Sequence, residues 1–143
     1  MSKISIPYKH AEELLQALVA IDEGSPVVID GESGRKTVVK VPFALGGICR
    51  MTLVRNLGAA RNAVEQFVAV RNGLIREISG GQDQIKPEAR DEVAKFASEM
   101  DKLLASPCEG EFRPFTQDDL KLDQNAIPAR ALEVLVATGL LAI

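Results

Sequence analysis

Five arginines make the region between Gly46 and Ser79 the part of this sequence best suited to binding chemistry. They are Arg50, Arg55, Arg61, Arg71 and Arg76. A guanidinium matches the oxygens of a phosphate or a carboxylate through paired hydrogen bonds. Asparagine follows arginine at positions 55–56, 61–62 and 71–72, although these spacings match no known anion motif. We hypothesise that these arginines bind a phosphate-bearing ligand such as a nucleotide, with ordinary surface exposure as the alternative.

Few other side chains in the sequence can do chemistry. His10 is the only histidine, and no serine or cysteine nucleophile pattern accompanies it. Cys49 and Cys108 are too few for a disulfide framework or a zinc site, so we expect them to be packed, reduced thiols. Acid–base catalysis needs positioned partners. We therefore expect no enzyme, no cofactor and no metal; the remaining enzymatic hypothesis would use Arg71 with facing carboxylates.

Gly46 and Gly47 precede a predicted helix, with Arg50 one turn inside it. Glycine amides at a helix N-terminus can bind an anion, but the phosphate-binding patterns GxxxxGK[ST] and GxGxxG are absent. A hinge or a tight helix start is the alternative interpretation.

The N-terminal third predicts a helix followed by a β-hairpin. Ile4 and Ile6 suggest a short strand, and residues 8–23 carry apolar residues at helical spacing up to Gly24, a predicted left-handed cap. Two β-branched runs, 27–29 and 36–41, flank a glycine-containing turn and predict the hairpin.

A long helix from about residue 48 to 78 is the clearest element. Its apolar residues recur every three or four positions and form one seam, with Arg71 in the middle at about 100° per residue. A second helix follows Pro87 and ends before Pro107. We expect Arg71 to form an ion pair with Glu92 or Glu99 of that helix, or to extend to its edge; the functional alternative is that it anchors a ligand or a partner chain.

The C-terminal region predicts a short edge strand over residues 111–115 and a helix that starts at Pro128 and ends at Gly139. Its apolar tail predicts a surface buried against another copy or another protein, with docking into the chain's own core as the alternative. The expected interface residues are Leu135, Leu140, Leu141 and Ile143.

Composition places these elements in one domain. The chain has 143 residues and a net charge of −3, so we expect no DNA binding. The expected fold is α+β and mainly helical, with a long antiparallel helical hairpin, a small β-hairpin sheet and a C-terminal helix. Its parts are 1–42, 43–106 and 107–143. Neither a secretory signal nor a long apolar run is evident, so we expect a cytoplasmic location and no membrane partner.

The stretch from about residue 36 to 141 resembles small uncharacterised proteins encoded by tailed bacteriophages. The resemblance is carried by Leu53-Val54-Arg55-Asn56-Leu57, Arg71 with Leu74, an acidic helix ending in Leu103-Leu104, and the terminal segment 131–135. It implies an accessory factor in host cytoplasm: a virion-assembly helper or an inhibitor of host defence. It carries over no active-site residues.

Two functions follow as hypotheses. The first is a non-enzymatic protein, homo-oligomeric, that binds a host or virion protein. The alternative is a protein that sequesters a nucleotide signal through the five arginines.

Overall fold

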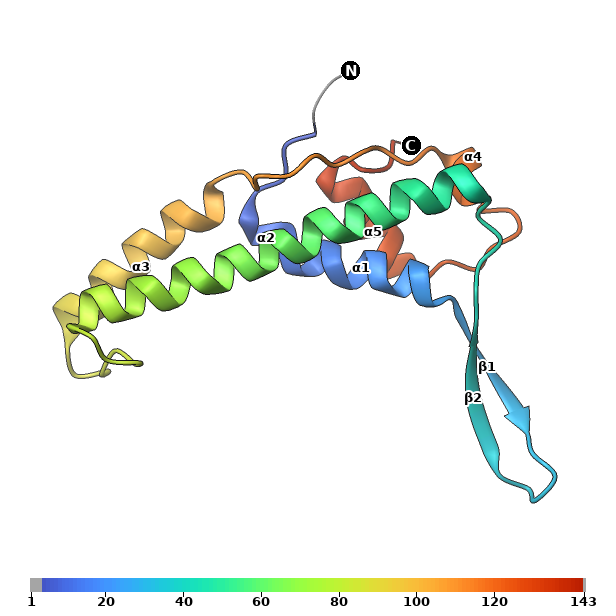
Figure 1. Cartoon of the computed structure of the whole chain (residues 1–143), viewed down its shortest axis with the longest axis horizontal. Helices are drawn as coiled ribbons and strands as arrows, with labels where there is room; N and C mark the ends of the chain where they lie inside the picture. Colours follow the sequence, from blue (N-terminus) through green and yellow to red (C-terminus); the bar gives the residue numbers. More distant parts are fainter. Residues whose placement is uncertain (1–3, 143) are drawn as a thin grey trace.

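The computed structural model describes residues 4–142, which form a mainly helical α+β fold (Figure 1). The expected fold class is therefore confirmed. Ile143, one of the expected interface residues, lies outside the described residues. In chain order the elements are η1 (Tyr8–His10), α1 (Ala11–Glu23), β1 (Ser25–Asp30), β2 (Lys36–Val41), α2 (Gly47–Ser79), α3 (Arg90–Ala105), α4 (Gln117–Leu120) and α5 (Ala129–Thr138).

The hydrophobic core lies between α1, the first half of α2, α5 and the segment around α4. Helix α1 buries Leu14, Leu18 and Ile21 completely, because these residues share one face at helical spacing. The segment after α3 contributes Phe112 and Phe115. Apolar burial is the main stabilising term of such a fold.

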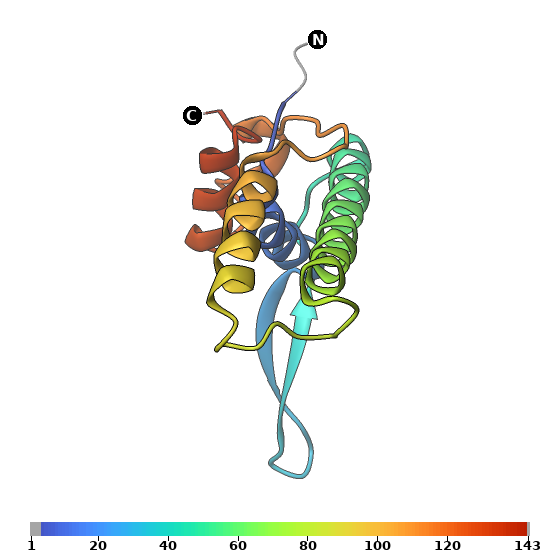
Figure 2. The same cartoon turned by 90° about the vertical axis from the view of Figure 1, so that its left-hand side faces the viewer.

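The apolar seam of α2 packs against the core along its first half and against α3 along its second half. The sequence suggested a single partner helix along the whole seam. Its first half packs into the core, and its last buried residue is Ala63. Its second half runs on beyond the core and lies antiparallel to α3, as Figures 1 and 2 show. No residue of α3 is buried. Residues 64–105 therefore form an arm that projects from the core, which we call the distal arm.

Two buried asparagines fasten irregular segments to the core. Asn56 donates from Nδ2 to the carbonyl of Arg113 at 2.9 Å and accepts from the Arg113 amide at 2.8 Å. Asn125 does the same with Ala44, at 3.1 and 3.0 Å. Each side-chain amide thus replaces the pair of hydrogen bonds that a neighbouring strand would provide.

Strands β1 and β2 pair antiparallel from Ser25↔Val41 to Asp30↔Lys36 and project away from the core (Figure 1). Gly24 fixes the base of this hairpin. Its φ is +95°, and a Cβ there would lie 2.1 Å from the carbonyl oxygen of Val41. An ion pair between Lys40 and Glu23 holds the same junction.

Several local expectations differ from the structure in detail. Gly24 ends α1 with positive φ, but its ψ of −166° is not left-handed helical. Helix α3 starts at Arg90 instead of in the turn after Pro87. Within residues 4–142, the expected strands near Ile4 and at 111–115 are present only as the single bridges Ile4↔Phe112 and Phe115↔Leu141.

Replacing Asn56 with alanine removes both hydrogen bonds to Arg113. We expect a loss of about 2 kcal/mol in the free energy of unfolding, measured by urea denaturation. Asn62→Ala is the matched control, since Asn62 is exposed on the same helix. Equal losses in both variants would contradict the role of Asn56.

Gly24→Ala and Gly58→Ala should act in opposite directions. Gly24 has positive φ and no room for a Cβ, so alanine there should lower the melting temperature. Nothing lies within 4 Å of a Cβ at Gly58, so alanine there should add about 0.5–1 kcal/mol through helix propensity. A neutral Gly24→Ala would contradict the described junction.

Candidate interaction surfaces

The five arginines of α2 do not converge on one site. Arg50 and Arg76 are 26 positions apart, which is about 39 Å along the helix axis. Arg50 donates from Nη2 to the carbonyl of Phe43 at 2.6 Å and so supports the loop before α2. Arg55 and Arg61 are exposed. None of the five main cavities in residues 4–142 is lined by two of the five arginines.

Arg76 lines a cavity of about 300 Å³ together with Asn72 and Asp83. Its Nε lies 3.7 Å from Asp83 Oδ1, and both side chains are largely exposed. The carboxylate of Asp83 offsets the charge that a phosphate would require. This cavity therefore holds a single arginine beside a carboxylate, and not the group of arginines that the sequence pattern suggested.

Arg71 is partly buried on the seam of α2, but the expected intrachain ion pair is not found. Within residues 4–142 no ion pair joins Arg71 to Glu92 or Glu99. Glu99 instead lies 3.6 Å from Lys102 of its own helix. Glu92 and Glu99 are both partly buried, so the seam between α2 and α3 holds charges of both signs without joining them.

The N-terminus of α2 faces carboxylates of its own chain. Gly46 and Gly47 line a cavity of about 260 Å³ with Asp118, Asp119 and Lys121. Two carboxylates at the positive end of a helix are favourable, and they oppose the approach of another anion. The glycine pair therefore serves as a helix start beside α4.

Neither cysteine is an activated nucleophile. Burial raises the pKa of the Cys49 thiol, and the nearby Asp119 carboxylate raises it further. Burial also raises the pKa of Cys108 and is the main reason that the pKa of Tyr8 is raised. A thiol with a raised pKa stays protonated near neutral pH and reacts slowly. Among the described residues no group of three His, Cys, Asp or Glu side chains is placed to hold a metal ion.

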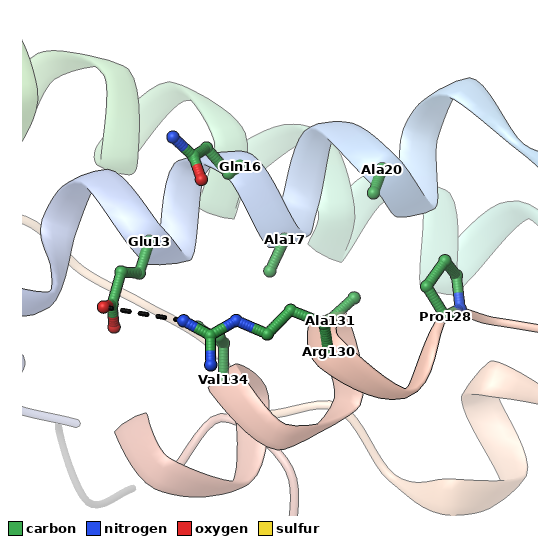
Figure 3. A pocket seen from close by; sticks show the side chains of 8 residues that line it. All are labelled: Glu13, Gln16, Ala17, Ala20, Pro128, Arg130, Ala131 and Val134. Atoms are coloured by element: carbon green, nitrogen blue, oxygen red, sulfur yellow. Dashed lines mark ion pairs between the residues drawn. The ribbon is translucent and has the colours of Figure 1, made fainter.

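A small groove separates α1 from α5 (Figure 3). Glu13 and Arg130 point toward each other across it, with 3.7 Å between Glu13 Oε1 and Arg130 Nη2. His10 Nδ1 lies 3.8 Å from the other oxygen of Glu13. The groove encloses about 120 Å³, well below the several hundred Å³ of a typical ligand pocket. The groove is therefore a contact between α1 and α5 with charged side chains at its border.

The C-terminal tail faces the chain's own core, which corrects the interface expected there. Leu135 and Leu140 are fully buried, and Leu141 nearly so. The amide of Leu141 donates to the carbonyl of Leu135, and the amide of Phe115 donates to that of Leu140 at 2.7 Å. These hydrogen bonds fold the tail back beneath the segment that precedes α4. These three residues are therefore not available to an interface between copies.

Most of the large apolar side chains that are exposed lie instead on three surfaces: the hairpin, the first turns of α2 and the distal arm. Strands β1 and β2 expose Val27, Val28, Ile29, Val38, Val39 and Val41. The first turns of α2 expose Ile48, Met51 and Val54, the first of these at 82%. The distal arm exposes Val68, Val70 and Val93. Sequence periodicity could not identify these surfaces, since an apolar pattern does not reveal whether the face it marks has a partner within the chain.

The tip of the distal arm is hollowed by an apolar pocket of about 540 Å³. Its lining comes from the end of α2, the following loop and the start of α3: Ile75, Asp83, Gln84, Ile85, Pro87, Val93 and Phe96. We call it the tip pocket.

The position of the arginines predicts that no nucleotide stabilises the protein. A ligand at about 100 times its dissociation constant adds about 2.7 kcal/mol to the free energy of unfolding. We expect mono-, di- and cyclic nucleotides to leave the melting temperature unchanged in a thermal-shift screen. A reproducible rise that Arg61→Ala or Arg71→Ala abolishes would restore the sequestering hypothesis.

None of the helices in residues 4–142 combines the length and the apolar character that a membrane span requires. Comparison of the chain with protein-family models, curated proteins and solved structures finds no match. The resemblance to phage proteins therefore stays a prediction.

Proposed function

We propose that this chain is a non-enzymatic accessory protein of phage type that binds a host or virion protein through the β1–β2 hairpin. The observation that carries the proposal is an aliphatic sheet face that no other part of residues 4–142 covers. Val27, Ile29, Val39 and Val41 share that face, because alternate residues of each strand point the same way and Val27 pairs with Val39. We call it the aliphatic face.

The aliphatic face has no charged residue, and its four side chains are between 40% and 49% exposed. The opposite face is different. It carries the Val28–Val38 pair, the oppositely charged Asp30–Lys36 pair, and Lys40. An isolated two-stranded hairpin is marginally stable in water, so an uncovered aliphatic face favours a partner that covers it.

The edges of the hairpin are less suitable for binding than its face. Pro26 removes a donor from β1, and Lys36 and Lys40 place charges on β2. Proline and lysine at sheet edges oppose the addition of further strands. The partner that fits is therefore a protein with an uncharged, apolar surface that packs on the aliphatic face.

The base of the hairpin is suited to presenting this face in one direction. Gly24 brings the end of α1 against the backbone of Val41, and Glu23 binds Lys40 across the same junction. A fixed base lowers the entropy lost when a partner binds.

A matched pair of double variants tests the proposal. Val27→Lys with Val39→Glu places a cross-strand charge pair on the aliphatic face and keeps the hairpin paired. Val28→Lys with Val38→Glu makes the same change on the opposite face. Tagged chains are used to capture proteins from the bacterial host and from virions, with quantitative mass spectrometry as the readout. We expect the first variant to lose a partner that the wild type and the second variant retain.

Loss of the same partner by both variants would show that the aliphatic face is not the binding surface. Capture of no specific protein by the wild type would contradict the function itself. Circular dichroism of each variant establishes that the helical part of the fold is intact.

A further inference from the structure

The distal arm has an apolar seam that its own two helices only partly bury. Six large apolar residues of the arm are partly buried, and none of them is fully enclosed. They are Phe67, Leu74 and Ile78 on α2, and Phe96, Met100 and Leu103 on α3. The tip pocket lies at the open end of the same seam. In a four-helix bundle the apolar faces of all four helices are enclosed in a shared core, whereas a pair of helices leaves part of these faces open. The arm therefore lacks the second layer that would complete its packing.

The base of the arm shows why the seam stays open. Tyr8 of η1 lies between the arm and the core, with its ring 6.3 Å from that of Phe67 and its hydroxyl donating to Gln66. The Tyr8 amide donates to the carbonyl of Ser106, just after α3. Beyond this contact the N-terminal segment turns into α1, and within residues 4–142 no core element runs alongside the outer part of the arm (Figures 1 and 2).

The charged residues on the apolar seam of the arm indicate which partner covers that seam. Arg71 lies eight residues before the end of α2, about 12 Å from it, and Glu99 lies nine residues after the start of α3, about 13.5 Å from it. The two side chains are thus at nearly the same level, yet no ion pair joins them within the described residues. The present contact of Glu99 is with the exposed Lys102, and such surface pairs contribute little.

We propose that the distal arms of two copies of this chain pack seam against seam, so that Arg71 of each copy forms an ion pair with Glu99 of the other. A twofold arrangement uses the same surface twice and satisfies both pairs of charges. Because Arg71 and Glu99 both lie near the middle of the arm, they meet whether the two arms run in the same or in opposite directions.

This proposal is independent of the hairpin. It concerns self-association through α2 and α3, whereas the proposed function concerns another protein bound by β1 and β2. Failure of one leaves the other standing, since the hairpin variants should not change the dimer and the arm variants should not change capture through the aliphatic face.

A charge-reversal cycle tests the proposal, with sedimentation velocity over a wide range of protein concentrations as the readout. We expect the wild type to form a dimer with twice the 15.4 kDa chain mass. Arg71→Glu or Glu99→Arg alone should weaken it by about a hundredfold, because each leaves like charges at the interface. The combination of both changes should restore most of the affinity.

Arg55→Glu is the matched control, because it makes the same change at an exposed position of α2 outside the arm. Val93→Glu, at a residue 41% exposed in the single chain, should also abolish the dimer without unfolding the protein. A wild type that stays monomeric at every concentration overturns the proposal. So does a dimer that Arg55→Glu weakens as much as Arg71→Glu, or one that the double variant fails to restore.

Discussion

Helix α2 is longer than the core that supports it, and this mismatch governs the rest of the structure. Its last buried residue is Ala63, but the helix continues to Ser79 with an apolar seam that only Arg71 interrupts. Among residues 4–142, Tyr8 of η1 contacts the start of this remainder at Gln66 and Phe67. Helix α3 lies along the rest, and no residue of α3 is fully buried. A helix that keeps an apolar stripe beyond its own core loses stability unless something else covers the stripe. The arm is therefore best understood as half of a packing unit, while the hairpin at the other end of the molecule exposes aliphatic surface of a different kind.

Where the core has no regular secondary structure, hydrogen bonds from buried side-chain amides hold its segments together. The side chains of Asn56 and Asn125 each satisfy both backbone groups of one residue in a crossing segment, so these segments need no sheet. The C-terminal tail closes the core by burying Leu140 and Leu141. With the core complete, exposed apolar surface remains on the hairpin, on the distal arm and on the outer face of the first turns of α2, and little of it lies at the α1–α5 groove.

Much of the fold follows from local patterns in the sequence. The periodicity of residues 48–78 gave the long helix, and the β-branched runs around the turn at 30–34 gave the hairpin, because both signals depend on neighbours in the chain. Long-range contacts were beyond such reasoning. Asn56 looked like one member of three Arg-Asn pairs, and only the fold reveals that it is fully buried against Arg113. The apolar side chains near the C-terminus suggested an interface, but apolar side chains are equally suited to a core, where Leu135, Leu140 and Leu141 lie. Arg71 is partly buried in α2, and whether it pairs with Glu92 or Glu99 depends on side-chain geometry that spacing does not determine.

The most direct test of an incomplete arm is an intermolecular distance on α3. A single nitroxide at the exposed Ala97, in a chain whose two cysteines are replaced, reports only on contacts between copies when measured by pulsed electron paramagnetic resonance. In a four-helix arrangement the two α3 axes lie within about 20 Å of each other, so packed arms should give a short, defined distance that disappears when unlabelled chain is added in excess. A label at Ala97 that shows no dipolar coupling in concentrated protein would contradict it.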